Sequence, residues 1–191
     1  MTVSAWTEVQ LAVGGALRLA CGDRRGLGFF DVSIEGFWRS FRAGVICYPL
    51  YLVLLIFRVP GDSWEQSGAP TILVVETIAF VISWVAFPLL ILPLARIFRR
   101  EDRFLAFIVA YNWSQIPQSV LFVLVALDSA TGLLGSSAAQ LAGLLAAIAA
   151  LIYEWYIARV ALAVTGAQAI LVVIVDLILG TLLGRVAQSL Y

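Results

Sequence analysis

Long apolar stretches constrain this chain more than any other feature of its sequence. A helix rises about 1.5 Å per residue, so roughly 20 apolar residues are needed to cross the hydrocarbon core of a bilayer. Five stretches meet that requirement, at about 37–58, 71–95, 104–127, 138–160 and 167–187. The sequence therefore predicts an all-α fold, a polytopic membrane helix bundle. Residues 37–191 would supply five transmembrane helices, and residues 1–36 would form a cytoplasmic or interfacial segment.

Prolines, glycines and polar clusters set the limits of these spans. Residues 59–70 hold Pro, Gly, Asp, Ser and Glu, a composition typical of a loop. Residues 138–184 are apolar for more than twice the length of one span, so the chain must turn once there. Thr165–Gly166 is the best break. Pro88 and Pro93 are expected to kink or break the second span.

Composition and charge narrow the function. Hydrophobic residues make up 62% of the chain, against about 45 to 50% in a soluble domain. The 12 acids balance the 12 bases, which are spread along the chain, so we expect no nucleic-acid partner. All of these bases are arginine and histidine is absent, which removes histidine metal ligands, the Ser-His-Asp arrangement and a lysine Schiff base. The sequence thus predicts a protein that is not an enzyme, with no catalytic residue, cofactor or metal.

The arginines also predict an orientation. In a five-span topology only Arg58 and Arg185 fall on the C-terminal side. The others fall on the N-terminal side, namely Arg18, Arg24, Arg25, Arg39, Arg42, Arg96, Arg99, Arg100, Arg103 and Arg159. Because basic residues gather on the cytoplasmic side of a membrane, we expect a cytoplasmic N-terminus and a periplasmic C-terminus.

An amphipathic pattern opens the chain. Residues 4–20 place one apolar face opposite Thr7, Glu8 and Arg18. That face consists of Ala5, Trp6, Val9, Ala12, Val13, Ala16, Leu17 and Ala20. A helix lying in the membrane interface fits this pattern, and packing onto the protein's own helices fits it equally well.

A second amphipathic pattern leads into the first span. Trp38 shares a face with other aromatic residues, whereas Arg39 and Arg42 lie opposite. We expect both arginines to reach up to the lipid headgroups. The predicted interfacial anchors are therefore Trp6, Trp38, Arg39 and Arg42.

Three acids lie inside apolar spans, Glu76, Glu154 and Asp176. An acid at the centre of a bilayer costs about 2.5 to 3.5 kcal/mol on insertion scales, so a functional site is the default hypothesis. Glu76 and Glu154 lie near the ends of their spans, where we expect partial hydration. Asp176 lies near the centre of its span and is the sharpest case.

Asp176 is expected to find partners on the third span. Asn112 and Gln115 lie at a similar depth, and Ser119 continues their helical stripe. A protonated carboxyl bonded to an amide would hold two helices together. A proton relay is the alternative. The sequence favours the first hypothesis, because a relay needs several titratable groups in series and histidine is absent.

Small residues recur on the last two spans. Ala139, Gly143 and Ala147 follow helical spacing in the fourth span, and Gly180 and Gly184 do so in the fifth. Such residues let helix backbones approach closely. We expect them to pair these two spans within one chain, with a homodimer or a larger membrane complex as the alternative.

Three short motifs carry a resemblance to known proteins. They are residues 29–41 (Phe-Phe-Asp-Val-Ser-Ile-Glu-Gly-Phe-Trp-Arg-Ser-Phe) followed by Pro49, residues 110–114 (Ala-Tyr-Asn-Trp-Ser) and residues 156–159 (Tyr-Ile-Ala-Arg). In these motifs the chain resembles small bacterial inner-membrane proteins, and its layout looks like that of the broad Yip-type family. Eukaryotic members of that family act in vesicle trafficking as partners of small GTPases. The chain lacks their Asp-Leu-Tyr-Gly-Pro motif, so the resemblance implies the bacterial inner membrane but no GTPase partner.

Two functions remain after these exclusions. The first is binding, in which a Yip-like protein organises the lipid bilayer or accompanies another membrane complex, as the packing motifs and interfacial helices favour. The second is a small proton- or ion-coupled transporter or channel that uses the intramembrane acids.

Overall fold

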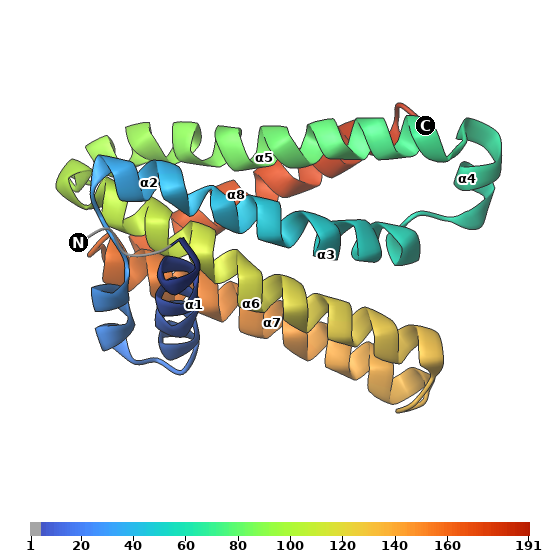
Figure 1. The fold of residues 1–191 in the computed structure, drawn as a ribbon, viewed down its shortest axis with the longest axis horizontal. Helices are drawn as coiled ribbons and strands as arrows, with labels where there is room; N and C mark the ends of the chain where they lie inside the picture. The colour runs from blue at the N-terminus through green and yellow to red at the C-terminus, as the bar shows by residue number, and fades with distance from the viewer. Residues whose placement is uncertain (1–4) are drawn as a thin grey trace.

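All regular structure is helical in residues 5–191, the part of the chain that the computed structural model describes (Figure 1). The first four residues of the expected 1–36 segment lie outside the described residues. The helices are α1 (Ala5–Ala20), η1 (Arg24–Phe29), α2 (Ile34–Ser40), α3 (Arg42–Arg58), α4 (Gly61–Ser67), α5 (Ala69–Ile97), η2 (Glu101–Arg103), α6 (Phe104–Thr131), α7 (Ser136–Ala161) and α8 (Gly166–Gln188). Here η marks a 3₁₀ helix.

Five helical segments are long and apolar enough to cross a membrane. They are Ile34–Arg58, Ala69–Ile97, Glu101–Thr131, Ser136–Ala161 and Gly166–Gln188. The first of them combines α2 and α3, because Phe41 between these helices keeps right-handed helical dihedral angles. The expected all-α fold with five long apolar helices is therefore confirmed.

The second span differs from the sequence expectation in two ways. The expected loop 59–70 contains the short helix α4, and α5 already begins at Ala69. Helix α5 also runs unbroken through Pro88 and Pro93 to Ile97, so the expected break is wrong, whereas a kink stays a prediction. Each proline removes one backbone donor, but in apolar surroundings the other peptide groups are best satisfied inside a continuous helix.

The turn between the last two spans falls where the sequence predicts it. The Gln168 backbone N–H donates to the Thr165 hydroxyl oxygen at 3.3 Å, and the Thr165 backbone N–H donates to the Gln168 side-chain oxygen at 3.0 Å. This reciprocal capping box satisfies donors that the start of a helix leaves open. It fixes the start of α8, which then packs against α7.

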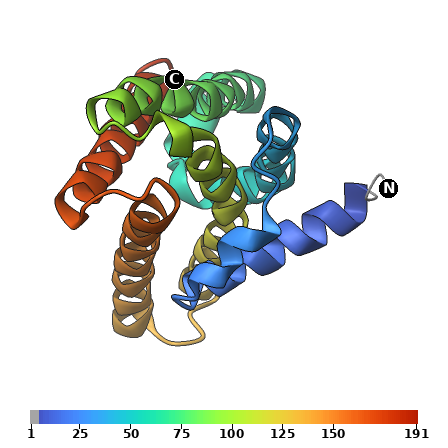
Figure 2. The ribbon, with the colours of Figure 1, turned by 90° about the vertical axis from the view of Figure 1, so that its left-hand side faces the viewer.

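Helix α6 lies at the centre of the bundle (Figure 2). Eight consecutive residues, 107–114, are all buried. Successive side chains of a helix point about 100° apart, so such a run means that other elements surround α6 on every side. The ring of Phe87 on α5 stacks on the ring of Tyr111 on α6, with 4.0 Å between the centroids. Polar groups on α6 can therefore meet several different helices.

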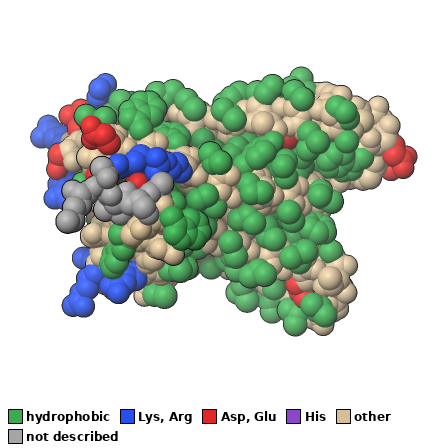
Figure 3. Space-filling model, in the orientation of Figure 1, with side chains coloured by type: hydrophobic (Ala, Val, Ile, Leu, Met, Phe, Trp, Pro, Cys, Tyr) green, Lys and Arg blue, Asp and Glu red, His purple; other side chains and the backbone are tan. Residues whose placement is uncertain are grey.

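Helices α1 and α2 lie at one end of the bundle and the C-terminus at the other, here named its N-terminal and C-terminal ends (Figure 1). Towards the C-terminal end, the hairpin of α6 and α7 leans away from α3 and α5. Arginine side chains gather at the N-terminal end, and hydrophobic side chains cover the length of the face shown in Figure 3. Such an exposed apolar belt is compatible with an integral membrane protein of several spans.

Helix α1 packs onto the bundle through one narrow stripe. Ala12, Gly15, Ala16 and Leu19 are buried at helical spacing. Trp6, which the sequence placed on the same apolar face, is 69% exposed. Packing onto the protein's own helices is thus confirmed for the stripe, and a position in the membrane interface stays a prediction.

The connector after α1 approaches that helix very closely. A Cβ atom on Gly26 would lie 2.5 Å from the carbonyl oxygen of Gly15. We therefore expect Gly26→Ala to displace the connector and to lower the free energy of unfolding by about 1 to 3 kcal/mol, measured by thermal unfolding in detergent. Gly28→Ala is the matched control, because a Cβ there meets no described atom within 4 Å. Equal melting temperatures for the two variants would contradict this packing.

Candidate functional site

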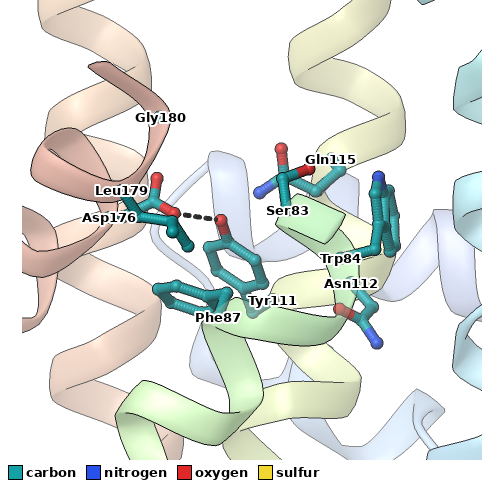
Figure 4. A pocket seen from close by; sticks show the side chains of 9 residues that line it. All are labelled: Ser83, Trp84, Phe87, Tyr111, Asn112, Gln115, Asp176, Leu179 and Gly180. Carbon is teal, nitrogen blue, oxygen red and sulfur yellow. Dashed lines mark hydrogen bonds between the residues drawn. The ribbon is translucent and has the colours of Figure 1, made fainter. Parts of the chain in front are cut away.

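Asp176 of α8 lies at the centre of the candidate site. Its Oδ1 accepts a hydrogen bond at 2.7 Å from the hydroxyl of Tyr111 on α6 (Figure 4). Asn112 and Gln115 do not bond it, so the expected pairing is wrong; Asn112 instead donates to the Ser40 hydroxyl at 2.8 Å. Residues 111 and 112 point about 100° apart, so they reach α8 and α2 respectively.

A cavity of about 190 Å³ adjoins Asp176 and brings several predicted residues together. Asp176, Asn112 and Gln115 all line it. The other lining residues are Ser83, Trp84, Phe87, Tyr111, Leu179 and Gly180. Ser119 lies elsewhere, against the Cys47 thiol of α3. The cavity has both polar and apolar lining residues and is large enough for several water molecules.

Glu154 of α7 is more deeply buried than expected. It is 5% exposed, and its Oε1 has no hydrogen-bond partner among the described residues. The expectation of partial hydration is wrong because α6, α8 and α1 all pack against α7.

Glu154 and Asp176 lie close enough for their charges to interact. They also lie at similar depth, seven residues before the end of α7 and ten residues after the start of α8. These spacings correspond to about 10 and 15 Å along the helices. The charges of both acids also act on the Tyr111 hydroxyl, so the three groups form one electrostatic cluster.

Two carboxyl groups so placed carry two negative charges only at high cost. In the described part of the chain, no arginine forms an ion pair with either of them. Like charges repel strongly in apolar surroundings. One proton or one monovalent cation held by the pair would relieve that repulsion. The arrangement can therefore take up and release a single positive charge.

Glu76 of α5 is the centre of a second polar cluster, nearer the C-terminal end. It is 1% exposed, so it is more deeply buried than its place near the end of the span led us to expect. Arg58 Nη2 donates to its Oε2 at 2.6 Å, the Tyr51 hydroxyl donates to the same oxygen, and the Tyr191 hydroxyl donates to Oε1 at 2.6 Å. These three donors satisfy both oxygens, which is why the carboxylate can be buried.

Tyr191, which follows the last span, bonds to this cluster through its hydroxyl. Burial raises the pKa of Tyr191 to about 12, and its hydrogen bond to the Glu76 carboxylate acts in the same direction. Its hydroxyl therefore stays a donor at neutral pH. The Ser67 hydroxyl of α4 donates to the Tyr191 carbonyl oxygen at 2.8 Å. The sequence reasoning missed Tyr51 and Arg58, although their spacing of two helical turns places them on one face.

A second cavity, of about 180 Å³, lies between the two clusters. Tyr51, Arg58 and Glu76 line it. Ser83 and Gly180 line both this cavity and the first, so the two cavities are neighbours along α5 and α8. The Glu76 cluster and Asp176 thus belong to one line of polar groups and open space.

Two of the predicted packing glycines border these cavities instead. A Cβ on Gly180 or Gly184 would meet no described atom within 4 Å, so their expected role in close helix packing is wrong. Both glycines line the second cavity. Their missing side chains leave open space, and they do not bring two backbones together.

Among the small residues of α7, Gly143 has a contact that shows which helix it faces, and that helix is α6. The nearest atom to a Cβ on Gly143 belongs to Val125 of α6, at 3.8 Å, so the expected pairing with α8 is wrong for Gly143. Ala139 is buried, whereas Ala147 is exposed. A short turn joins α6 to α7, so these two consecutive helices pack directly against each other.

Arg39 and Arg42 form ion pairs with acids of the protein itself. Arg39 Nε lies 3.0 Å from Glu8 Oε1, and Arg42 Nη1 lies 3.3 Å from Glu8 Oε2. Arg39 also pairs with Asp31. Hydrogen bonds from Ser33, and then the Arg39 charge, hold the pKa of Asp31 below its usual value. Both arginine side chains are also partly exposed, so their contact with lipid headgroups stays a prediction.

Comparisons with known proteins identify no relative, so a function has to be argued from the geometry of the site. A scan against models of protein families finds no match, and searches of curated proteins and of solved structures find none either. Within residues 5–191, no three side chains of His, Cys, Asp or Glu come together to hold a metal ion. The polar clusters around Asp176 and Glu76 are the features that a function has to explain.

Proposed function

We propose that this protein is a small integral membrane transporter that binds and releases a proton or a monovalent cation at the Glu154–Asp176 pair. The observation that carries this proposal is the buried Glu154 oxygen without a hydrogen-bond partner beside a second acid. A carboxylate kept only to hold helices together would be satisfied, as Glu76 is. An unsatisfied one costs stability, and proteins retain such costs at functional sites.

The cavities support a route from Asp176, one member of this pair, towards the C-terminal end. The first cavity leads from Asp176 to Ser83 and Gly180, and the second leads on to Arg58 and Glu76. Polar groups beside a cavity are the usual lining of an ion path inside a membrane. Glu154 is buried where α1, α6 and α8 pack against α7, and it lines neither cavity. The proposed cycle therefore includes a second conformation that opens access to Glu154.

A binding role is the second candidate, and it keeps the Yip-type resemblance. Trp6 and Trp38 are 69% and 67% exposed, on helices that lie together at the N-terminal end. Exposed tryptophans beside spans suit a membrane interface or a partner protein. In this case we propose a bacterial inner-membrane protein that organises lipid or accompanies a membrane complex. A companion that stays bound during purification from native membranes would support this role.

We propose that the N-terminus is cytoplasmic and the C-terminus periplasmic, because ten of the 12 arginines fall on the N-terminal side of the spans. A fluorescent reporter that matures only in the cytoplasm should be bright when fused after Arg100 and dark when fused after Tyr191. A phosphatase active only in the periplasm should give the opposite pattern. Bright fluorescence from the Tyr191 fusion would contradict this orientation.

Flux through the reconstituted protein tests the transport proposal. We expect an imposed pH gradient, alone or opposed by a Na⁺ or K⁺ gradient, to collapse faster in liposomes that contain the protein than in empty ones. A pH-sensitive dye inside the liposomes reports the rate. If no protein-dependent flux appears under any of these gradients, the transport proposal is wrong.

A further inference from the structure

Two arginines from distant parts of the sequence line one hollow at the N-terminal end of the bundle. Arg24 begins η1, Arg159 lies near the end of α7, and both line a space of about 280 Å³. The other lining residues are Leu27, Val160 and Ala163. This Arg24–Arg159 hollow thus combines two cations with an apolar wall.

Contacts around the hollow hold the Arg159 guanidinium and the connector that leads to Arg24. The Arg159 guanidinium lies over the Trp155 ring, 5.4 Å from its centroid, and the Trp155 indole N–H donates to the Gly166 carbonyl at 3.0 Å. The Tyr156 hydroxyl of α7 donates to the Gly22 carbonyl at 2.5 Å, just before Arg24. The connector that carries Arg24 is therefore bonded to the helix that carries Arg159.

No described acid neutralises either arginine. Arg18, Arg39, Arg42, Arg58, Arg96 and Arg103 all form ion pairs, whereas Arg24 and Arg159 form none. The nearby Asp23 pairs with Arg18 at 3.9 Å and accepts from the Arg25 backbone N–H at 3.0 Å. Two guanidinium groups on one space repel each other until an anion joins them.

We propose that the Arg24–Arg159 hollow binds the phosphate of an anionic phospholipid. Planar guanidinium groups pair with phosphate oxygens through two parallel hydrogen bonds. Leu27 and Val160 give the apolar surface along which an acyl chain lies, and Arg159 comes two residues before the end of a candidate span. A basic pocket beside the end of a span, as here between η1 and the end of α7, suits such a headgroup. The proposal holds for the transport role and for the binding role.

Native mass spectrometry of the detergent-solubilised protein tests this site. Phosphatidylglycerol is titrated against phosphatidylcholine with the same acyl chains. We expect Arg24→Gln/Arg159→Gln to weaken phosphatidylglycerol binding about thirtyfold, since each basic residue contributes about a factor of five. Phosphatidylcholine binding should stay unchanged. Arg24→Lys/Arg159→Lys keeps the charge but not the parallel hydrogen bonds, and should give an intermediate loss even if the glutamine variant folds poorly.

The matched control is Arg25→Gln/Arg100→Gln. It removes the same charge from two arginines that form no ion pair with a described acid and lie outside the hollow. We expect less than about a twofold loss for this pair. Equal losses in both glutamine pairs would overturn the proposal in favour of diffuse surface charge. Displacement of the lipid by inorganic phosphate at equal concentration would overturn it in favour of a soluble phosphate ligand.

Discussion

Arg58→Met is expected to lower the free energy of unfolding by about 3 kcal/mol, because it leaves the Glu76 carboxylate buried without its cation. Glu76 is 1% exposed, and Arg58 is the arginine that pairs with it. The Arg58 side chain is 41% exposed, which places the loss at the lower end for a broken buried pair. Thermal unfolding in detergent measures the loss.

Two further variants isolate the pair from general effects of charge. Arg185→Met removes the other arginine near the C-terminal end, which forms no ion pair with a described acid, and should change stability by less than about 0.5 kcal/mol. Arg58→Met/Glu76→Leu removes both charges and should recover most of the lost stability, because no buried charge is left behind. If Arg58→Met melts at the same temperature as Arg185→Met, Arg58 does not stabilise Glu76.

The span count could be predicted from the sequence because length and hydropathy decide it. The run 71–95 had to be a helix of membrane length wherever its neighbours lay. The turn at Thr165–Gly166 could also be predicted, because the apolar run 138–184 is too long for one span and offers no better break. The continuity of α5 through Pro88 and Pro93 could not, since proline rules from water underestimate how strongly apolar surroundings favour a complete helix.

The hydrogen-bond partner of Asp176 could not be predicted from the sequence, for a different reason. In a soluble helix, polar and apolar faces show which side meets the core. In a membrane, lipid and protein interior are both apolar, so that signal is lost. Depth along the helix could therefore be predicted, and it brought Asn112 and Gln115 to the cavity of Asp176. The helix face on which each residue lies could not be predicted, and it is Tyr111 that donates the hydrogen bond to Asp176.

The structural role of each glycine could not be predicted from the sequence either. A small residue allows two backbones to approach, as Gly15 of α1 does beside Gly26 of η1. It also leaves space open, as Gly180 does between the two cavities. The sequence does not distinguish these uses, because only the neighbouring helix decides between them. The signal that remained available was opposite charge: Arg58 and Glu76 occur near the facing ends of two consecutive antiparallel spans.

Glu154→Gln and Asp176→Asn are each expected to reduce proton or cation flux in liposomes by about a hundredfold or more. Each substitution keeps the size of the side chain but removes the carboxyl group that takes up positive charge. Asp176→Asn also keeps an oxygen to accept the Tyr111 hydrogen bond, so its melting temperature should stay close to that of the parent protein. Ser119→Ala is the control, since Ser119 faces Cys47 away from the cavity, and it should retain full flux.

Stability separates a transport site from a structural one at Glu154. If Glu154 held helices together, Glu154→Met would lose stabilising hydrogen bonds and melt earlier. Because its Oε1 has no described partner, we expect instead that Glu154→Met melts at the same or a higher temperature, while flux is lost. A variant that gains stability as it loses flux is typical of a residue kept for function against its own cost. Full flux in both Glu154→Gln and Asp176→Asn would show that neither acid carries the transported charge.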